Sequence, residues 1–302
     1  NVTALGIVSC FTDFSSEMIM GILPFFVVNT LGLSREILGV IEGSSELTSH
    51  ASRMFSGTLS DKTGKRKIFV LAGYGLSTIS KPFFAVAHGW LDVILVRNGD
   101  RVGKGLREAP RDALIVDSVP ESKLGKAFGF HRMIDQLGGI AGPITAFFLI
   151  EWIGIRGIFL TSLIPSVIAL IVLIFFVKEI AIKKCTNKTV FSNIGTLIRK
   201  NKWFVFLLVI GGIFGIGSFN FSFVLLKASD LGISRDFVPL VYAVIQGVYA
   251  LMSIPAGILS DKIRKEYVLM LSYGVFLLSA LLMMFLAGNS VYAFVIAVVF
   301  GT

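Results

Sequence analysis

The residues best suited to chemistry are charged side chains at helical spacing within apolar surroundings. Most of them lie in the segment RNGDRVGKGLREAPRDALIVDS, which begins at Arg97. Its charges recur every three or four positions and share one face of a helix: Arg97, Arg101, Lys104, Glu108 and Arg111. Arg107 and Asp112 lie off this face, and Pro110 is expected to end or bend the helix. Such a face is stable only opposite acids or a water-filled cavity.

Carboxylates occur at matching spacing in other apolar segments. Asp13 and Glu17 are four residues apart, as are Glu42 and Glu46, and Asp135 lies in a later segment. A carboxylate near cations in a cavity can take up and release a proton as its surroundings change. The pattern predicts proton transfer at Asp13, Glu17 and Asp135. It predicts solute binding at four further charged residues: Glu46, Arg97, Arg101 and Lys104.

The second half of the sequence offers neutral hydrogen-bonding and aromatic groups instead. Asn220 and then Tyr242 and Gln246, four residues apart, are predicted to complete the solute site. One charged wall and one neutral, aromatic wall suit an amphipathic or zwitterionic organic solute. The alternative is a structural charge network that only holds the first helices together.

Other chemistries find little support in the sequence. The run Gly103-Lys104-Gly105 lacks the rest of a phosphate-binding loop. The three histidines lie far apart, and Cys10 and Cys185 suggest neither a disulfide nor a metal site. The sequence predicts no enzyme activity and no cofactor or metal, with a proton gradient as the energy source.

The composition indicates an integral membrane protein. Of 302 residues, 54% are hydrophobic and 16% charged, with a mean hydropathy of +0.81. Apolar runs of about 20 residues recur, which is the length that crosses a bilayer. The net charge of +9 is concentrated in short loops, so it favours membrane topology over nucleic-acid binding. We expect about ten spans, near 4–30, 37–59, 67–87, 91–117, 124–150, 157–178, 203–227, 236–259, 267–288 and 290–302.

Loop charges predict the orientation. Lysine and arginine crowd the loops at 62–67, 123–126, 183–202 and 262–265, whereas the opposite loops hold only Arg35, Arg156 and Arg235. The crowded loops are expected in the cytoplasm, together with the N-terminus, which places the protein in the cytoplasmic (inner) membrane.

An internal repeat divides the chain. GTLSDKTGKRK begins at Gly57 and GILSDKIRKE begins at Gly257, each after the second span of its half. This predicts an N-terminal six-helix bundle at 1–178, a cytoplasmic linker at 179–202, and a C-terminal bundle at 203–302 with about four helices. The start at Asn1 and the apolar run at the end suggest that further sequence belongs to the protein. Parallel halves with a site between them are typical of transporters.

These motifs resemble those of the major facilitator superfamily. GTLSDKTGKRK is similar to its loop signature G-x-L-a-D-r-x-G-r-k, and RNGDRVGKG to its helix-4 motif. GFHRMIDQLGGIAGP resembles its helix-5 antiporter motif, although Ala146-Phe147 replaces the closing glycine pair. The resemblance implies an all-α fold of two six-helix bundles. It also implies conformational gating at nine residues: Gly57, Asp61, Gly64, Arg66, Gly138, Gly142, Pro143, Gly257 and Asp261.

The expected function is secondary transport of a small organic solute by alternating access, by proton-coupled export and as a monomer in the lipid bilayer. Proton-coupled uptake of a small organic anion, with Arg101 and Lys104 as ligands, is the alternative. A further alternative, from another class of function, is a non-transporting membrane receptor.

Overall fold

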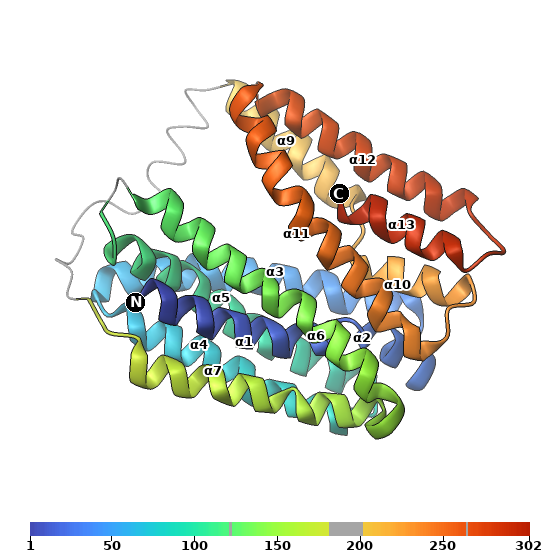
Figure 1. Ribbon diagram of the computed structural model, residues 1–302, viewed down its shortest axis with the longest axis horizontal. Coiled ribbons are helices and arrows are strands. Elements are labelled where there is room, and N and C mark those ends of the chain that lie inside the picture. Colours follow the sequence, from blue (N-terminus) through green and yellow to red (C-terminus); the bar gives the residue numbers. More distant parts are fainter. Residues whose placement is uncertain (121–122, 181–201, 264) are drawn as a thin grey trace.

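The structure is a computed structural model that describes residues 1–120, 123–180, 202–263 and 265–302. Every element in these ranges is helical (Figure 1). The first half holds α1 (Val2–Met20), α2 (Leu23–Phe25), η1 (Phe26–Thr30), α3 (Arg35–Thr63), α4 (Arg66–Ser80), η2 (Lys81–Val86), α5 (Trp90–Asp117), α6 (Leu124–Thr161) and α7 (Leu163–Phe176). The second half holds α9 (Lys202–Gly217), α10 (Phe221–Asp230), η4 (Arg235–Phe237), α11 (Val238–Lys262), α12 (Lys265–Phe285) and α13 (Val291–Gly301).

The helices follow the expected spans, with three differences. The seventh span is not continuous, because the helix stops after Gly217 and restarts at Phe221 with Asn220 as its N-cap. Helix α5 runs past Pro110 to Asp117, so this proline does not end it. Helix α6 keeps helical backbone angles at Pro143 and breaks at Gly154, whose φ of 66° suits a residue without a Cβ.

The outer surface is apolar, as a bilayer requires. Large hydrophobic side chains such as Trp152, Phe175 and Met284 are exposed. Four described segments are by themselves long and apolar enough to cross a membrane: Val2–Thr30, Arg66–Val86, Ala127–Phe176 and Tyr267–Phe285. Helices α3 and α5 are long enough, but they carry several charged residues. These charges must therefore lie inside the protein or at its ends.

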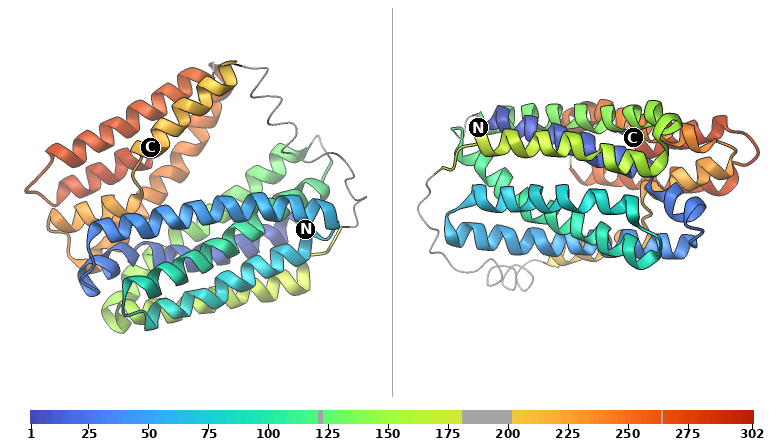
Figure 2. Two further views of the ribbon diagram at one scale, coloured as in Figure 1. Left: turned by 180° about the vertical axis from the view of Figure 1, so that it is seen from behind. Right: turned by 90° about the horizontal axis from the view of Figure 1, so that it is seen from below.

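The two halves meet at one end of the molecule. Helix α1 packs on α6 and α7, and α5 packs on α3 and α4. Between the halves, α10 contacts α2 and α11 contacts α6. In Figures 1 and 2 the α9–α13 helices lie close to the first half at this end and diverge from it toward the other.

The N-terminus lies at the diverging end. The side chain of Asn1 is bonded to the backbone of Lys178, with distances of 3.0 and 2.9 Å. At the same end the Glu179 carboxylate accepts the first backbone N–H groups of α4, from Arg66 and Lys67, at 3.0 and 2.9 Å. The N-terminus, the turn between α3 and α4 and the end of the sixth span therefore share one side, which agrees with the predicted alternation of spans.

Candidate functional site

A charged cavity of about 20 Å³ lies between α1 and α5, within the first half of the protein. Its lining joins acids and cations from only these two helices: Asp13, Ser16, Glu17, Met20, Arg97, Asp100, Arg101, Lys104 and Arg107. The four-residue spacing of Asp13 and Glu17 places both on the face of α1 that meets α5. The sequence prediction that the charges of α5 face acids of neighbouring helices is therefore matched by the geometry.

Arg97 is the most completely buried of the cations. Its side chain is 0% exposed, and one of its terminal nitrogens donates to Glu42 Oε2 on α3 at 2.7 Å. Its other terminal nitrogen contacts the sulfur of Met20 at 2.6 Å. A buried arginine is stable only with a partner of this kind. Glu42 thus fixes Arg97 against α3.

Arg101 and Arg107 differ from Arg97, because neither forms an ion pair with a carboxylate among the described residues. Their exposed fractions are 8% and 4%. Arg101 Nε and Arg107 Nη1 are buried without a hydrogen-bond partner. The Arg107 guanidinium stacks over the Tyr74 ring, 4.6 Å from its centre. Unpaired buried donors are costly, so these two groups have capacity for a further acceptor.

Two acids meet at the interface of α1 and α6. The carboxyl groups of Asp13 and Asp135 lie close to each other across this interface. Ser9 also donates to Asp135 at 2.5 Å and accepts from Arg111 at 3.2 Å. An ionised carboxylate only accepts hydrogen bonds, so a bond between two carboxyl groups requires one of them to hold a proton. The geometry suits a shared proton at Asp13 and Asp135.

Glu17 links the two halves of the protein. The hydroxyl of Tyr242, on α11, donates a hydrogen bond to Glu17 Oε2, on α1. Tyr242 is buried. Glu17 therefore lines the charged cavity of the first half and bonds directly to the second half.

Tyr242 also borders a second cavity, of about 170 Å³. Its lining comes from α10, α11 and α13 and is mostly aromatic and apolar: Phe221, Tyr242, Ile245, Gln246, Tyr249, Phe300 and Gly301. The rings of Phe221 and Tyr242 lie 4.7 Å apart. Gln246 is the one side-chain amide in this lining, and its nitrogen lies near Gly139 of α6. The two cavities meet at the Glu17–Tyr242 hydrogen bond.

Three residues lie elsewhere than their spacing in the sequence suggests. Glu46 does not line the charged cavity; its side chain is 50% exposed and lies 3.9 Å from His50 on the surface of α3. Glu42, one helical turn earlier, is buried instead.

Arg107 was expected to lie off the charged face of α5, but it is on the face that lines the cavity. Asn220 does not line either cavity, because it caps α10 and reaches Glu42 at 3.3 Å. Lys104 does line the charged cavity and is 3.8 Å from Glu108.

The sequence interpretation missed Lys81, a buried ammonium group in η2. It donates to Ser15 Oγ at 2.8 Å, to Ser166 Oγ at 3.0 Å and to the carbonyl of Thr12 at 3.4 Å. These acceptors come from α1 and α7, so Lys81 ties three spans together. The available signal was a single lysine within an apolar span, a position that normally has a specific partner.

The loop signature forms a compact turn between α3 and α4. Gly64 has a φ of 68° and donates from its N–H to the Ser60 carbonyl at 2.9 Å, so it ends α3 in a conformation that favours glycine. Asp61 lies 3.4 Å from Arg66, and Arg66 also pairs with Asp117 at the end of α5. A Cβ on Gly57 would lie 3.3 Å from that of Ala109, so α3 and α5 approach closely there.

The glycines of α6 pack against α1. A Cβ at Gly142 would lie 2.5 Å from the carbonyl oxygen of Phe14, and one at Gly138 would overlap the carbonyl of Cys10. Pro143 directly follows the second of these glycines. The corresponding residues of the second repeat, Gly257 and Asp261, fall near the end of α11, and their side chains lie outside the described part of the structure.

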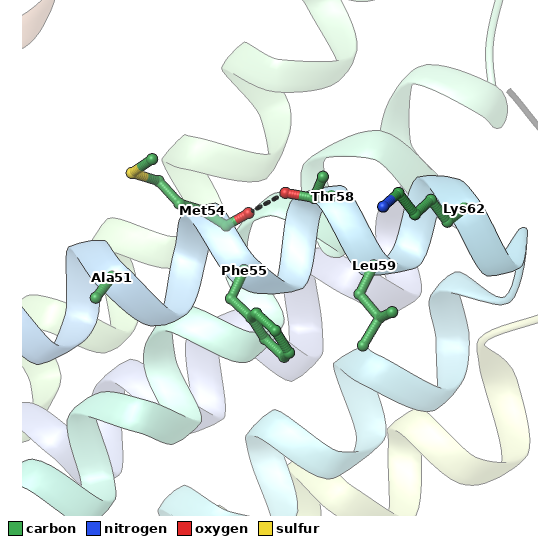
Figure 3. Close-up of a pocket in the computed structure, with 6 residues that line it drawn as sticks. All are labelled: Ala51, Met54, Phe55, Thr58, Leu59 and Lys62. Atoms are coloured by element: carbon green, nitrogen blue, oxygen red, sulfur yellow. Dashed lines mark hydrogen bonds between the residues drawn. The ribbon is translucent and has the colours of Figure 1, made fainter. Parts of the chain in front are cut away.

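A larger hollow of about 440 Å³ lies elsewhere, on one face of α3. Figure 3 shows Phe55 and Leu59 pointing to one side of the helix and Met54 to the other, with Thr58 donating to the Met54 carbonyl at 2.5 Å. Lys62 is the single charged residue of this lining. Its size does not make it the functional site, because it offers almost no polar groups to orient a ligand.

The sequence is similar to those of known proteins, and the similarity shows its family. The sequence profile of the Major Facilitator Superfamily matches residues 5–302, and the chain belongs to this family. It is 36% identical over 285 residues to the uncharacterized MFS-type transporter MJ1317 of Methanocaldococcus jannaschii, covering 91% of this chain and 70% of that protein. It is 28% identical over 221 residues to the quinolone resistance protein NorA of Staphylococcus aureus, covering 72% of this chain and 56% of NorA.

A solved structure confirms the fold. The crystal structure of a bacterial homologue of the human lysosomal transporter Spinster, in an inward-facing and unoccupied conformation, matches 99% of this chain and 71% of its own chain. The TM-score is 0.75 at 17% sequence identity. The chain is therefore an all-helical, multi-pass membrane protein of the transporter class and not an enzyme, with a small molecule as its substrate.

Proposed function

We propose that the protein is a proton-coupled secondary transporter that exports a small organic solute by alternating access. The single observation that carries this proposal is the Glu17–Tyr242 hydrogen bond, which connects an acid of the charged cavity to the opposite half of the protein. The relationship to NorA, whose name refers to quinolone resistance, supports export.

Protonation of Glu17 would change the strength of this link. A hydrogen bond to an ionised carboxylate contributes about 1.5–3 kcal/mol, against about 0.5–1.5 kcal/mol for a neutral pair. A proton on Glu17 therefore weakens the link by about 1–2 kcal/mol, which changes a conformational equilibrium by about tenfold. Asp13 and Asp135 provide a second proton site at the α1–α6 interface.

In this proposal the moving units are the halves 1–178 and 203–302, joined by a linker at 179–202. The glycine contacts between α6 and α1, and the turn around Asp61 and Arg66, keep the first half rigid while the contacts of α10 and α11 change. The diverging end carries the N-terminus and faces the cytoplasm in the proposed topology, in the cytoplasmic membrane. A single chain with two halves suits a functional monomer.

Uptake of a small organic anion is the second candidate, because one observation favours it. The charged cavity contains two buried guanidinium groups, on Arg101 and Arg107, without carboxylate partners in the described chain. An imported anion would supply the missing acceptor. The direction of proton flux separates this candidate from export.

The test is solute-driven proton flux in liposomes. The full-length protein is reconstituted with a pH-sensitive dye inside, a pH gradient is imposed, and anionic, neutral and cationic organic solutes are added in turn. We expect at least one solute class to drive proton movement in the wild type and not in Glu17→Gln. Proton release coupled to solute entry identifies exchange, and parallel movement identifies uptake with the proton.

Glu151→Gln is the matched control, because Glu151 is an exposed carboxylate on α6, away from both cavities. It should keep the wild-type flux. Solute movement that is equally fast in Glu17→Gln, or that never moves protons in the wild type, would contradict proton coupling through Glu17.

A further inference from the structure

We infer that the transported solute carries a carboxylate, which binds to Arg101 and Arg107 in the charged cavity, and an apolar body, which occupies the aromatic cavity beside Tyr242. This inference rests on the proposed transport function and assigns a substrate class to the same site.

Two cations of the cavity lining have no carboxylate within ion-pair distance among the described residues. The lining holds four cations, Arg97, Arg101, Lys104 and Arg107, and three carboxylates, Asp13, Glu17 and Asp100. Glu42 and Glu108, outside the lining, add two carboxylates as partners of the cations. Three of these groups already have a partner: Arg97 is bound to Glu42, Lys104 lies near Glu108, and Asp100 accepts from Ser77. Arg101 and Arg107 are therefore the two cations of this lining without an ion-pair partner in the described chain.

The same two residues have free hydrogen-bond donors, and Arg97 adds a third through its buried Nε. Arg101 Nε and Arg107 Nη1 are buried and have no partner in the described chain. Arg101 makes one long contact, 4.0 Å from its terminal nitrogen to the sulfur of Met20. Guanidinium groups bind planar carboxylates through paired, charge-assisted hydrogen bonds. The cavity measures about 20 Å³, close to the space of one water molecule, so a carboxylate can enter only as the lining moves apart.

The aromatic cavity can hold the rest of the solute. It measures about 170 Å³ and presents the rings of Phe221, Tyr242, Tyr249 and Phe300. Tyr242 borders this cavity, and its hydroxyl bonds to Glu17 of the charged cavity. A solute that spans both cavities must therefore pass the Glu17–Tyr242 pair, so that its binding displaces the contact between the halves.

Three probes with the same apolar body and different charge test the inference: phenylbutyrate, phenylbutyramide and phenylbutylamine. Each is added at millimolar concentration to the purified full-length protein, and the apparent melting temperature is measured as a function of concentration. We expect phenylbutyrate to stabilise the wild type and the other two probes to have at least about tenfold lower apparent affinity.

Substitutions of the two arginines test whether phenylbutyrate binds to them. Arg101→Gln and Arg107→Gln should each weaken phenylbutyrate binding by about tenfold or more, whereas Arg101→Lys, which keeps the charge, should recover part of it. Arg156→Gln is the matched control, since Arg156 lies at the far end of α6 and bonds to the Ala87 carbonyl. Arg101→Lys and Arg156→Gln also show whether a loss reflects misfolding rather than a missing ligand group.

The same probes in liposomes separate this inference from the proposed function. Proton flux driven by phenylbutylamine and not by phenylbutyrate would overturn the inference and leave coupled transport standing. Stabilisation by phenylbutyrate that survives in Arg101→Gln and Arg107→Gln would also overturn it, as would the absence of stabilisation by phenylbutyrate. Stabilisation that both variants lose, without proton flux for any probe, would support the anion site and contradict proton coupling.

Discussion

Tyr242 of α11 donates a hydrogen bond to the carboxylate of Glu17 of α1, and this bond joins the two halves of the protein inside the membrane. The rings around Tyr242 shield the bond, which strengthens it relative to one in water. The same carboxylate lines the cavity that holds Arg101 and Lys104. One residue thus experiences the charge of the cavity and contributes to the contact between the halves.

A proton shared by Asp13 of α1 and Asp135 of α6 should be detectable by infrared spectroscopy. If Asp13 and Asp135 share one, infrared spectroscopy of the wild type will show the carbonyl stretch of a protonated carboxyl group, and this band will disappear in Asp13→Asn. The amide introduced by this substitution can still donate to Asp135, so the apparent melting temperature should change little. A partly exposed acid on the other half, Asp236, provides the control: Asp236→Asn should keep the band. An unchanged band in Asp13→Asn would exclude a proton on this residue.

Because α6 packs closely on α1, the effect of a Gly→Ala substitution in α6 on stability should depend strongly on its position. Gly142→Ala places a Cβ 2.5 Å from the Phe14 carbonyl oxygen, so α1 must move, at a cost of about 1–3 kcal/mol. Gly129→Ala, on the same helix, meets no atom within 4 Å and should be neutral or stabilising by up to about 1 kcal/mol. Thermal unfolding in detergent compares the two variants. Equal melting temperatures would show that the α1–α6 contact is looser than described.

An ion pair at the meeting end of the halves predicts a rescue by charge reversal. Arg35 of α3 binds both oxygens of Asp230 of α10, at 2.8 and 2.6 Å. Both side chains are half exposed, so the pair contributes only about 0.2–1 kcal/mol. Arg35→Asp or Asp230→Arg alone should change the transport rate by up to about fivefold with little change in melting temperature. The double variant should recover the wild-type rate, and a double variant as impaired as the single ones would contradict a role for the pair itself.

The fold could be predicted from the sequence because its signals are local. Apolar runs indicated the spans, and the glycine at position 64 ends α3 as the loop signature requires. The break before Phe221 could not be predicted, since residues 203–227 are apolar almost throughout and the interruption depends on Asn220 capping α10 and contacting Glu42.

The site could be predicted only in part, because spacing identifies a helical face but not how the helix is rotated. The stripe Arg97, Arg101, Lys104, Glu108 and the stripe Arg97, Asp100, Lys104, Arg107 fit a helix equally well. The structure turns Asp100 and Arg107 toward α1, while Glu108 pairs with Arg53 of α3. The same ambiguity explains why Glu42, and not Glu46, is buried. Lys81 was missed because its partners are serines and a carbonyl group, which carry no charge that marks them in the sequence.

The most direct test of coupling through Glu17 measures the separation of the halves as this residue is protonated. Spin labels on cysteines introduced at Lys62 of α3 and Met270 of α12, in a background without Cys10 and Cys185, report the distance across the diverging end. Because protonation weakens the bond to Tyr242, we expect acid to increase the population with this end closed, that is, with a shorter distance. Glu17→Gln should show that population at neutral pH and no longer respond to acid, and Tyr242→Phe should shift in the same direction. A pH response in Glu17→Gln equal to that of the wild type would contradict coupling of the two halves through Glu17.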